Sequence, residues 1–358
     1  MNSTTSLYDL SLPELEQRLA TAGHPRYRAL QVWEWLYQKQ ARTLDEMSNL
    51  PKAMRQSLSQ EFALGRLHPV MDLHSKDGLT RKVLFELPDG AQVEAVKMTY
   101  LRALGRQKRN TLCISSQAGC AMGCTFCATG QGGFQRNLSS GEIVEQVLFF
   151  ARALREQGDH VGNVVFMGMG EPFANYDQVM KAVRTMTDSK GIGLGNRRIT
   201  ISTVGLVPQI LRFAEEGSQV NLAISLHAAT DELRGKSMPV NRRFSIAQLL
   251  DACRTYTQKT HRRVSFEWAM INDVNDSPEQ AAQLAQRLKG MLCHVNLIPL
   301  NPTPGFPGAP SDPQRIAAFC HVLDEHGIPN SIRARKGLDI NAACGQLRQH
   351  HAQRTAAK

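Results

Sequence analysis

The chain has 358 residues, of which 42% are hydrophobic and 21% charged, and its formal net charge is +10. This composition is that of a folded globular protein and excludes a disordered or collagen-like chain. No apolar run approaches the roughly 18 residues that a membrane span requires, and the N-terminus lacks the pattern of a secretory signal. We therefore expect a cytoplasmic protein without membrane contact. Its eight cysteines are then metal ligands, catalytic thiols or core residues rather than disulfide partners.

Residues 1–65 are predicted to form a small helical domain. Ser11 and Glu14 make a capping box before the first helix, and two further helices are expected over about 25–40 and 50–62. Four basic residues give this region a positive side: Arg26, Arg28, Lys39 and Arg42. A solvated bundle surface and an RNA-contacting module both explain that charge, so both interpretations stay open.

Residues 66–105 are expected to form a β-hairpin connector. Two segments with alternating apolar residues flank the turn signal Pro88-Asp89-Gly90, and the second of them carries Glu94. A basic loop follows, with Arg102, Arg106, Lys108 and Arg109. Positive charge of this kind suits a polyanionic partner, because Lys and Arg release the counterions condensed on phosphates.

Residues 106–340 alternate between strand and helix patterns, which predicts parallel β/α units. The strand-like runs are 111–115, 163–168, 198–203, 220–227, 263–270 and 294–300. The helical patterns are at about 140–155, 174–187, 206–216, 245–258, 276–289 and 313–326. Six units fit an α/β barrel, complete or partial, whose functional residues gather at the C-terminal ends of the strands. Residues 341–358 remain as a C-terminal segment.

The most specific motif is Cys120-x3-Cys124-x2-Cys127, in a glycine-rich loop after the first barrel strand. A structural zinc site needs four ligands and usually two C-x2-C pairs, and ferredoxin motifs bring a fourth cysteine. Three thiolates leave one iron of a [4Fe-4S] cube without a protein ligand. That iron is free to chelate S-adenosylmethionine (SAM), and electron transfer from the cube can then cleave the sulfonium. Zinc with a distant fourth ligand is the alternative.

On this motif the chain resembles the radical SAM superfamily, whose core is a partial (β/α)6 barrel. Phe126 stands at the aromatic position usual before the third cysteine, and residues 168–172 resemble the glycine-rich motif that takes the SAM amino group. The resemblance implies a partial (β/α)6 barrel with a small N-terminal helical domain. It also implies one [4Fe-4S] cluster and SAM as cofactors.

Nearly the whole chain is similar to a narrower group, the RlmN/Cfr family of radical SAM RNA methyltransferases. The matching strings are TLCISSQAGCAMGCTFCATG (111–130), FMGMGEP (166–172), ISTVGLVP (201–208), ISLHA (224–228), NLIPLNP (296–302) and IRARKGLDINAACGQL (332–347). By this resemblance the SAM-contacting positions are Gly170, Glu171, Ser202, Ser225, Leu226, His227 and Asn301. Each polar residue stands at or near the end of a predicted strand, although any one alone could be a turn or core residue.

The resemblance assigns catalytic roles to Cys344, Cys113 and Glu94. Cys344 lies in a small-residue turn, open to attack, whereas Cys113 lies on the first barrel strand and would otherwise be read as a buried core thiol. The family's mechanism methylates Cys344 from one SAM, and a 5′-deoxyadenosyl radical from a second SAM activates that methyl group for addition to the adenine ring. Glu94 would remove the ring proton, and Cys113 would release the product through a transient disulfide.

The implied function is methylation of adenine C2 in 23S ribosomal RNA and in transfer RNA, with flavodoxin or ferredoxin as electron donor. Pro172 after Gly170-Glu171 favours C2 over the C8 chemistry of the Cfr branch. Two other classes remain as alternatives: a radical SAM protein-activating enzyme, whose extra cysteine motifs are absent, and a non-catalytic RNA-binding protein with a structural cluster. Three cysteines match no motif and are read as small hydrophobic residues: Cys253, Cys293 and Cys320.

Overall fold

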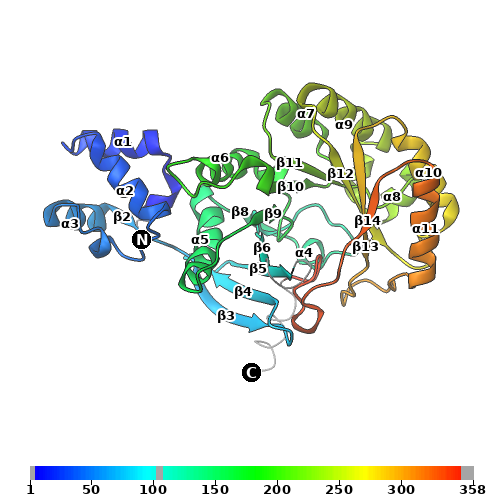
Figure 1. Cartoon of the computed structure of the whole chain (residues 1–358), viewed down its shortest axis with the longest axis horizontal. Helices are drawn as coiled ribbons and strands as arrows, with labels where there is room; N and C mark the ends of the chain where they lie inside the picture. Colours follow the sequence, from blue (N-terminus) through cyan, green and yellow to red (C-terminus); the bar gives the residue numbers. More distant parts are fainter. Residues whose placement is uncertain (1–4, 102–107, 348–358) are drawn as a thin grey trace.

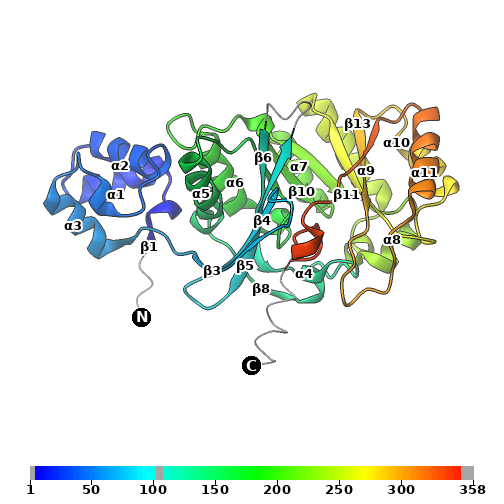
Figure 2. The ribbon, with the colours of Figure 1, turned by 60° about the horizontal axis from the view of Figure 1, so that its bottom comes forward.

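The computed structural model describes residues 5–101 and 108–347. A small helical domain lies at one end of an elongated molecule and the strand-rich part at the other (Figures 1 and 2). Arg102 and Arg106 of the predicted basic loop, and residues 348–358 of the C-terminal segment, lie outside the described residues. None of the helices in the described ranges is long and apolar enough to cross a membrane.

The N-terminal domain contains the three predicted helices, which are α1 (Leu12–Thr21), α2 (Tyr27–Tyr37) and α3 (Lys52–Glu61). The capping box is confirmed, because Ser11 Oγ accepts from the Glu14 backbone amide and the Glu14 carboxylate accepts from that of Ser11. Two short strands pair in parallel beside the helices: β1 (Thr5–Ser6) and β2 (Phe62–Ala63). Trp33 and Tyr37 are buried in the core of this domain.

Most of the predicted basic side of this domain is engaged in ion pairs. Arg26 lies 2.8 Å from Glu16 and Lys39 lies 3.7 Å from Glu34. Arg42 pairs with Glu156 of the barrel. These carboxylates partly neutralise the positive side chains that were expected to attract a polyanion.

In the described part of the chain, ten strands form one continuous sheet in the order β14-β13-β12-β11-β10-β9-β6-β5-β4-β3. Their bounds are β3 (His68–His74), β4 (Thr80–Glu86), β5 (Gln92–Leu101), β6 (Lys108–Cys113), β9 (Asn163–Phe166), β10 (Ile199–Thr203), β11 (Asn221–Ser225), β12 (Val264–Met270), β13 (Cys293–Pro299) and β14 (Asn330–Ile332). From β6 through β9 to β14, each strand pairs in parallel with its neighbour.

Six helices connect these parallel strands, as in the predicted barrel. They are α5 (Ser140–Glu156), α6 (Tyr176–Thr187), α7 (Val207–Glu215), α9 (Ile246–Thr260), α10 (Pro278–Leu288) and α11 (Pro313–Glu325). Shorter elements within the loops are β7 (Gln117–Gly119), α4 (Ala128–Gln131), β8 (Phe134–Asn137) and α8 (Asp231–Ser237). The partial (β/α)6 barrel expected from the sequence is confirmed.

The barrel is left open because β6 pairs with β5 instead of with β14 in the described structure. Strands β5, β4 and β3 then extend the barrel sheet in antiparallel fashion. The predicted hairpin connector is thus continuous with the barrel, and β6 begins inside the expected loop, at Lys108. Strands β3 and β14 were not predicted, because β3 is an exposed edge strand without regular apolar–polar alternation and β14 has only three residues.

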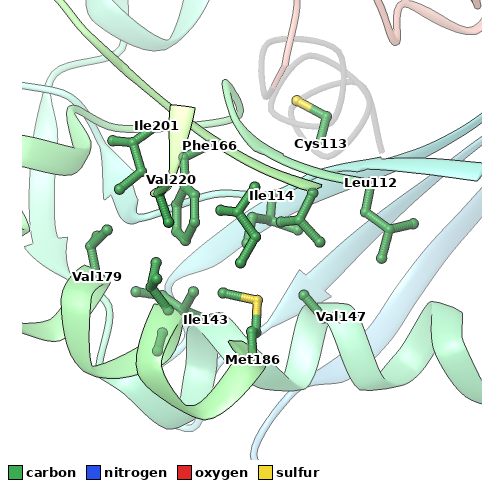
Figure 3. Close-up of a cluster of buried hydrophobic side chains, with 14 of the residues drawn as sticks. Leu112, Cys113, Ile114, Ile143, Val147, Phe166, Val179, Met186, Ile201 and Val220 are labelled. Atoms are coloured by element: carbon green, nitrogen blue, oxygen red, sulfur yellow. The ribbon is translucent and has the colours of Figure 1, made fainter. Parts of the chain in front are cut away.

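Alternation along β6 sends neighbouring side chains to opposite faces of the sheet. Leu112 and Ile114 point toward α5, where they meet Ile143 and Val147 in the main apolar core, whereas Cys113 points the other way (Figure 3). The Cys113 side chain is therefore buried on the other face of the sheet from Leu112 and Ile114, although it belongs to the same continuous apolar core.

Helix α5 also anchors the N-terminal domain. The buried Glu145 carboxylate accepts the backbone N–H of Arg66 at 2.6 Å, at the point where the chain leaves that domain. Burial raises the pKa of Glu145 to about 7. About two helical turns further along α5, Arg152 donates to the backbone carbonyl of Ala41 at 3.0 Å. Both contacts fix the helical domain against the first helix of the barrel.

Candidate active site

Ten of the predicted site residues line one cavity at the C-terminal ends of the barrel strands, here called the strand-end cavity. They are Cys120, Cys124, Cys127, Gly170, Glu171, Ser202, Ser225, His227, Asn301 and Cys344. A second cavity, the thiol cavity, is lined by both Cys113 and Cys344. The two cavities share five lining residues, so they are neighbours: Met167, Ile298, Asn301, Arg333 and Cys344. Residues predicted from distant parts of the sequence are thereby brought together.

The three cysteines of the motif lie in a loop held by backbone hydrogen bonds to other elements. The amide of Cys120 donates to Gly133 at 2.8 Å, and that of Thr125 donates to the carbonyl of Ser237, at the end of α8, at 3.0 Å. Gly130 packs closely on the loop, since a Cβ there would lie 3.1 Å from the backbone of Cys124. The loop is therefore joined by hydrogen bonds to neighbouring segments on both sides.

The donor set fits an iron–sulfur cluster. Burial raises the pKa of the Cys120 thiol to about 12 and also raises the pKa of Cys124, so both thiols stay protonated until a metal displaces the proton. Among the described residues, no three Cys, His, Asp or Glu side chains form a group that could hold a single metal ion. Three thiols that face one cavity can ligate an iron–sulfur cluster, whereas a structural zinc site uses four ligands.

The glycine-rich segment after β9 makes a close backbone approach possible. Gly170 has φ +100°, and a Cβ at this position would lie 2.5 Å from Gln117 Cβ, so no other residue fits. The Glu171 carboxylate accepts the backbone amides of Phe173 at 3.0 Å and Val204 at 2.8 Å. Burial raises the pKa of Glu171 to about 7. Glu171 thus joins the loop after β9 to the loop after β10.

His227 combines a structural contact with a place in the strand-end cavity. Its Nδ1 accepts the backbone amide of Ala269 at 2.9 Å, and its backbone has φ +58°. Burial, followed by the charge of Arg234, lowers the pKa of His227 to about 3, so the ring is neutral. Leu226, by contrast, is fully buried and lines neither cavity with its side chain.

Cys344 is held at the boundary of the two cavities by contacts on either side of it. The Asn301 side-chain amide donates to the Cys344 carbonyl at 3.1 Å, and the Ala128 amide donates to the Gly345 carbonyl at 2.7 Å. Ala128 directly follows the third cysteine of the motif. The Oδ1 atom of Asn301 is buried without a hydrogen-bond partner, which leaves an acceptor directed at no protein group.

Cys113 is a buried free thiol in the thiol cavity. Burial raises its pKa to about 12, and the nearby Cys344 adds to this effect, whereas Arg333 opposes it. The pKa of Arg333 is raised, chiefly by Cys344. Both sulfurs therefore share one cationic neighbour. Arg333 lies within the matching string 332–347, but the sequence analysis gave it no role.

Glu94 lies outside both cavities, on β5. Its carboxylate Oε1 is 3.1 Å from Lys82 Nζ on β4, and both side chains are almost fully buried. Glu94 was assigned only through the family resemblance, and Lys82 was not among the predicted site residues. No local signal identifies Lys82, because the two-residue alternation of TRKVLFE places it on the same face as Thr80 and Glu86.

Comparisons with known proteins agree with this arrangement. A family model described as "Radical SAM superfamily" matches residues 114–285. A second model, described as "Ribosomal RNA large subunit methyltransferase N-terminal domain", matches residues 5–64, which is the helical domain.

Full-length relatives extend the similarity to both parts together. The chain is 49% identical to a probable dual-specificity RNA methyltransferase RlmN of Chloroflexus aurantiacus, over 97% of this chain and 93% of that protein. It is 46% identical to the dual-specificity RNA methyltransferase RlmN 1 of Myxococcus xanthus, over 97% and 95%. A solved radical SAM methyltransferase from Sphaerobacter thermophilus superposes with a TM-score of 0.92 at 50% identity, over 96% and 99%. The chain therefore belongs to the RlmN family of radical SAM RNA methyltransferases.

Proposed function

We propose that this enzyme methylates C2 of adenine in 23S ribosomal RNA and in transfer RNA, in the cytoplasm, with Cys344 as the carrier of the methyl group. The observation that carries the proposal is that Cys344 lines both cavities. Its sulfur can therefore be methylated on the side of the cluster cysteines and can meet Cys113 on the other side. A sulfur with only a structural role would not need access to both.

The residues present fit the cofactors of the family. Cys120, Cys124 and Cys127 would hold a [4Fe-4S] cluster. SAM would be held by Gly170, Glu171, Ser202, Ser225, Leu226, His227 and Asn301, where the unpartnered Asn301 Oδ1 offers an acceptor; Leu226 would contribute through its backbone. When bound, with flavodoxin or ferredoxin as the electron donor, the cluster and two SAM molecules per turnover supply a methyl group and the radical that activates it.

The protein's own residues would complete the reaction at three atoms. Cys344 Sγ carries the methyl carbon to the adenine. Glu94 takes the proton from the ring carbon as the adduct gives up its unpaired electron, for which the cluster would serve as the acceptor. Cys113 Sγ then attacks Cys344 Sγ, and the carbon–sulfur bond breaks with its electron pair left on the carbon, which takes up a proton and becomes the product methyl group. This attack requires the Cys113 thiolate. Burial raises the pKa of Cys113 to about 12 and so disfavours the thiolate, whereas the neighbouring guanidinium of Arg333 favours it.

Nucleoside mass spectrometry of modified RNA tests the proposed product. The full chain, reconstituted anaerobically with iron, sulfide, SAM and a reductant, should convert adenosine in ribosomal RNA and transfer RNA to 2-methyladenosine. Pro172, buried at the start of the turn after Glu171, matches the C2 branch of the family. Formation of 8-methyladenosine would show that the enzyme methylates C8 and not C2. RNA that stays unmodified although SAM is cleaved would contradict the assignment of RNA as the substrate.

The RNA is expected to contact exposed cations near β6 more than the paired ones of the helical domain. Lys108 and Arg109 are exposed at the start of β6, and Arg109 lies over the Tyr100 ring. Lys108→Ala should therefore reduce the slope of log affinity against log salt by up to about one unit. Arg26→Ala is the matched control, because Glu16 already neutralises that guanidinium. An unchanged slope for Lys108→Ala would exclude this surface from the RNA interface.

A further inference from the structure

A buried carboxylate inside the barrel, that of Glu267 on β12, has one oxygen that no protein group satisfies. The side chain lines the strand-end cavity and is 5% exposed. Its Oε1 accepts the side-chain amide of Asn296 at 2.8 Å, whereas Oε2 is buried and accepts no hydrogen bond from any described residue. Buried polar atoms are nearly always paired, so this oxygen requires an explanation.

Arg333 is the cation beside this oxygen, but it does not satisfy it. Its Nη1 lies 3.7 Å from Glu267 Oε2, which is too long for a hydrogen bond, and donates to the sulfur of Met167 at 3.3 Å. The pKa of Arg333 is raised by Cys344 and also by Glu267, so the guanidinium is near both. All three side chains line the strand-end cavity. Its wall therefore offers a sulfur, N–H donors beside the sulfur, and a free acceptor beside the donors.

A third cavity, here called the strand-start cavity, reaches Glu267 from the other end of the barrel. It has a volume of about 620 Å³ and shares Glu267 and Arg333 with the strand-end cavity. Its lining includes the first residues of β9 and β11 and three arginines: Asn163, Asn221, Arg109, Arg262 and Arg263. Arg109 follows Lys108, where RNA is expected to bind. A base that leaves the RNA stack at this surface can therefore reach Glu267 through a polar, cationic cavity.

The edge of adenine that carries C2 presents groups that match this wall. N1, an acceptor, is next to C2, and the 6-amino group, a donor, is next along the same edge. A base whose C2 faces Cys344 can therefore meet Arg333 with N1 and the free oxygen of Glu267 with its amino group. Guanine has an N–H donor at position 1 and an acceptor oxygen at position 6. It would place donor against donor and acceptor against acceptor.

We propose that Glu267 is a specificity-determining residue whose Oε2 accepts a hydrogen bond from the 6-amino group of the target adenine, while Arg333 donates to N1. This inference rests on the proposed function, in which adenine C2 is the methylated carbon. It gives a substrate partner to the oxygen that no described residue satisfies. Two contacts along one edge also orient the base, so that its C2 is directed at Cys344.

The experiment measures single-turnover methylation of synthetic RNA stem-loops by the reconstituted full chain. One stem-loop contains the adenosine that nucleoside mass spectrometry identifies as the methylated one. In two further RNAs this nucleoside is replaced by purine riboside, which lacks the 6-amino group, or by inosine, which carries an oxygen there. All three bases keep a hydrogen on C2. Because the intrinsic reactivity of C2 differs between the bases, the measured result is the ratio of two rates, compared between enzymes.

Glu267→Gln keeps the shape of the side chain and reverses its contact with the base. Asn296 continues to donate to the side-chain carbonyl, so the new amide nitrogen takes the place of Oε2 and presents a donor. The ratio of the adenosine rate to the purine rate should be about tenfold to a hundredfold lower than in wild type, the range for a lost hydrogen bond to a charged group. The ratio of the inosine rate to the adenosine rate should rise, because the oxygen at position 6 now meets a donor.

Glu267→Leu guards against a folding defect in the glutamine variant. It has no polar group, so it should lower the ratio of adenosine to purine in the same way, without a contact that favours inosine. The loss of the ion pair with Arg333 slows all three RNAs alike and cancels in the ratios. Intact mass should show the methyl group on Cys344 in every variant, because that step does not involve the RNA base.

Asp276→Asn is the matched control, because Asp276 is a buried carboxylate that pairs with Arg315 and lines none of the three cavities. It should leave both ratios at their wild-type values. Ratios that stay the same in wild type and in both Glu267 variants would overturn the role of Glu267. A wild-type enzyme that forms no 2-methyladenosine in the adenosine RNA would instead overturn the proposed function.

Discussion

Cys113→Ala should accumulate protein that is covalently joined to RNA, whereas Cys344→Ala should give neither this species nor methylated product. Both sulfurs line the thiol cavity, but Cys344 alone of the two also lines the strand-end cavity among the described residues. Without Cys344 no carrier forms. Without Cys113 the carrier forms and attacks the adenine, but nothing breaks the bond between Cys344 and the ring, because release requires attack by a second sulfur.

Nuclease digestion followed by intact mass measures the adduct, as a mass increase equal to the remaining nucleotides. Cys253→Ala is the matched control, because Cys253 is fully buried in α9, away from both cavities. It should methylate RNA and leave no adduct. Identical behaviour of the Cys113 and Cys344 variants would contradict the division of roles between the two thiols.

Loss of any one of Cys120, Cys124 and Cys127 should abolish both SAM cleavage and RNA methylation. Anaerobically reconstituted wild-type protein should contain about four irons per chain, as a [4Fe-4S] cluster requires. Each variant lacks one of three ligands that line the strand-end cavity. Their supporting loop is joined to neighbouring elements by backbone hydrogen bonds to Gly133 and Ser237.

Iron and sulfide analysis together with the electron paramagnetic resonance signal of the reduced cluster measures this effect independently of activity. Cys293→Ala is a suitable control, since Cys293 is a buried residue at the start of β13 and lines neither cavity. It should keep the iron content of wild type. Stoichiometric zinc without iron after reconstitution would contradict the cluster assignment.

The sequence predicted the barrel well because its signals are local. The capping box at Ser11 and Glu14 and the six strand–helix alternations each depend on residues a few positions apart. The same holds for the cysteine motif, whose members lie within eight residues. Elements with weak patterns were missed: β3 is exposed along most of its length and lacks regular alternation, and β14 has only three residues.

Contacts between distant residues could not be predicted in this way. The pairing of Lys82 with Glu94 depends on the register of β4 and β5, and the contact of Lys82 with Asn341 spans 259 positions. Cys113 shows the same limit, because burial alone suggests a core thiol. When both faces of a strand are buried, the sequence pattern does not show which elements pack on each face. The structure is needed to tell which face carries Cys113.

The hydrogen bond from the Ala128 amide to the Gly345 carbonyl has a consequence for maturation. Ala128 begins α4 directly after Cys127, so the position of Cys344, the proposed methyl carrier, depends on how the loop of the three motif cysteines is folded. We expect a newly made chain without iron to hold this loop, and with it Cys344, less firmly. Insertion of the cluster would then act as a checkpoint, because the carrier is presented to RNA only by a chain that can also activate it.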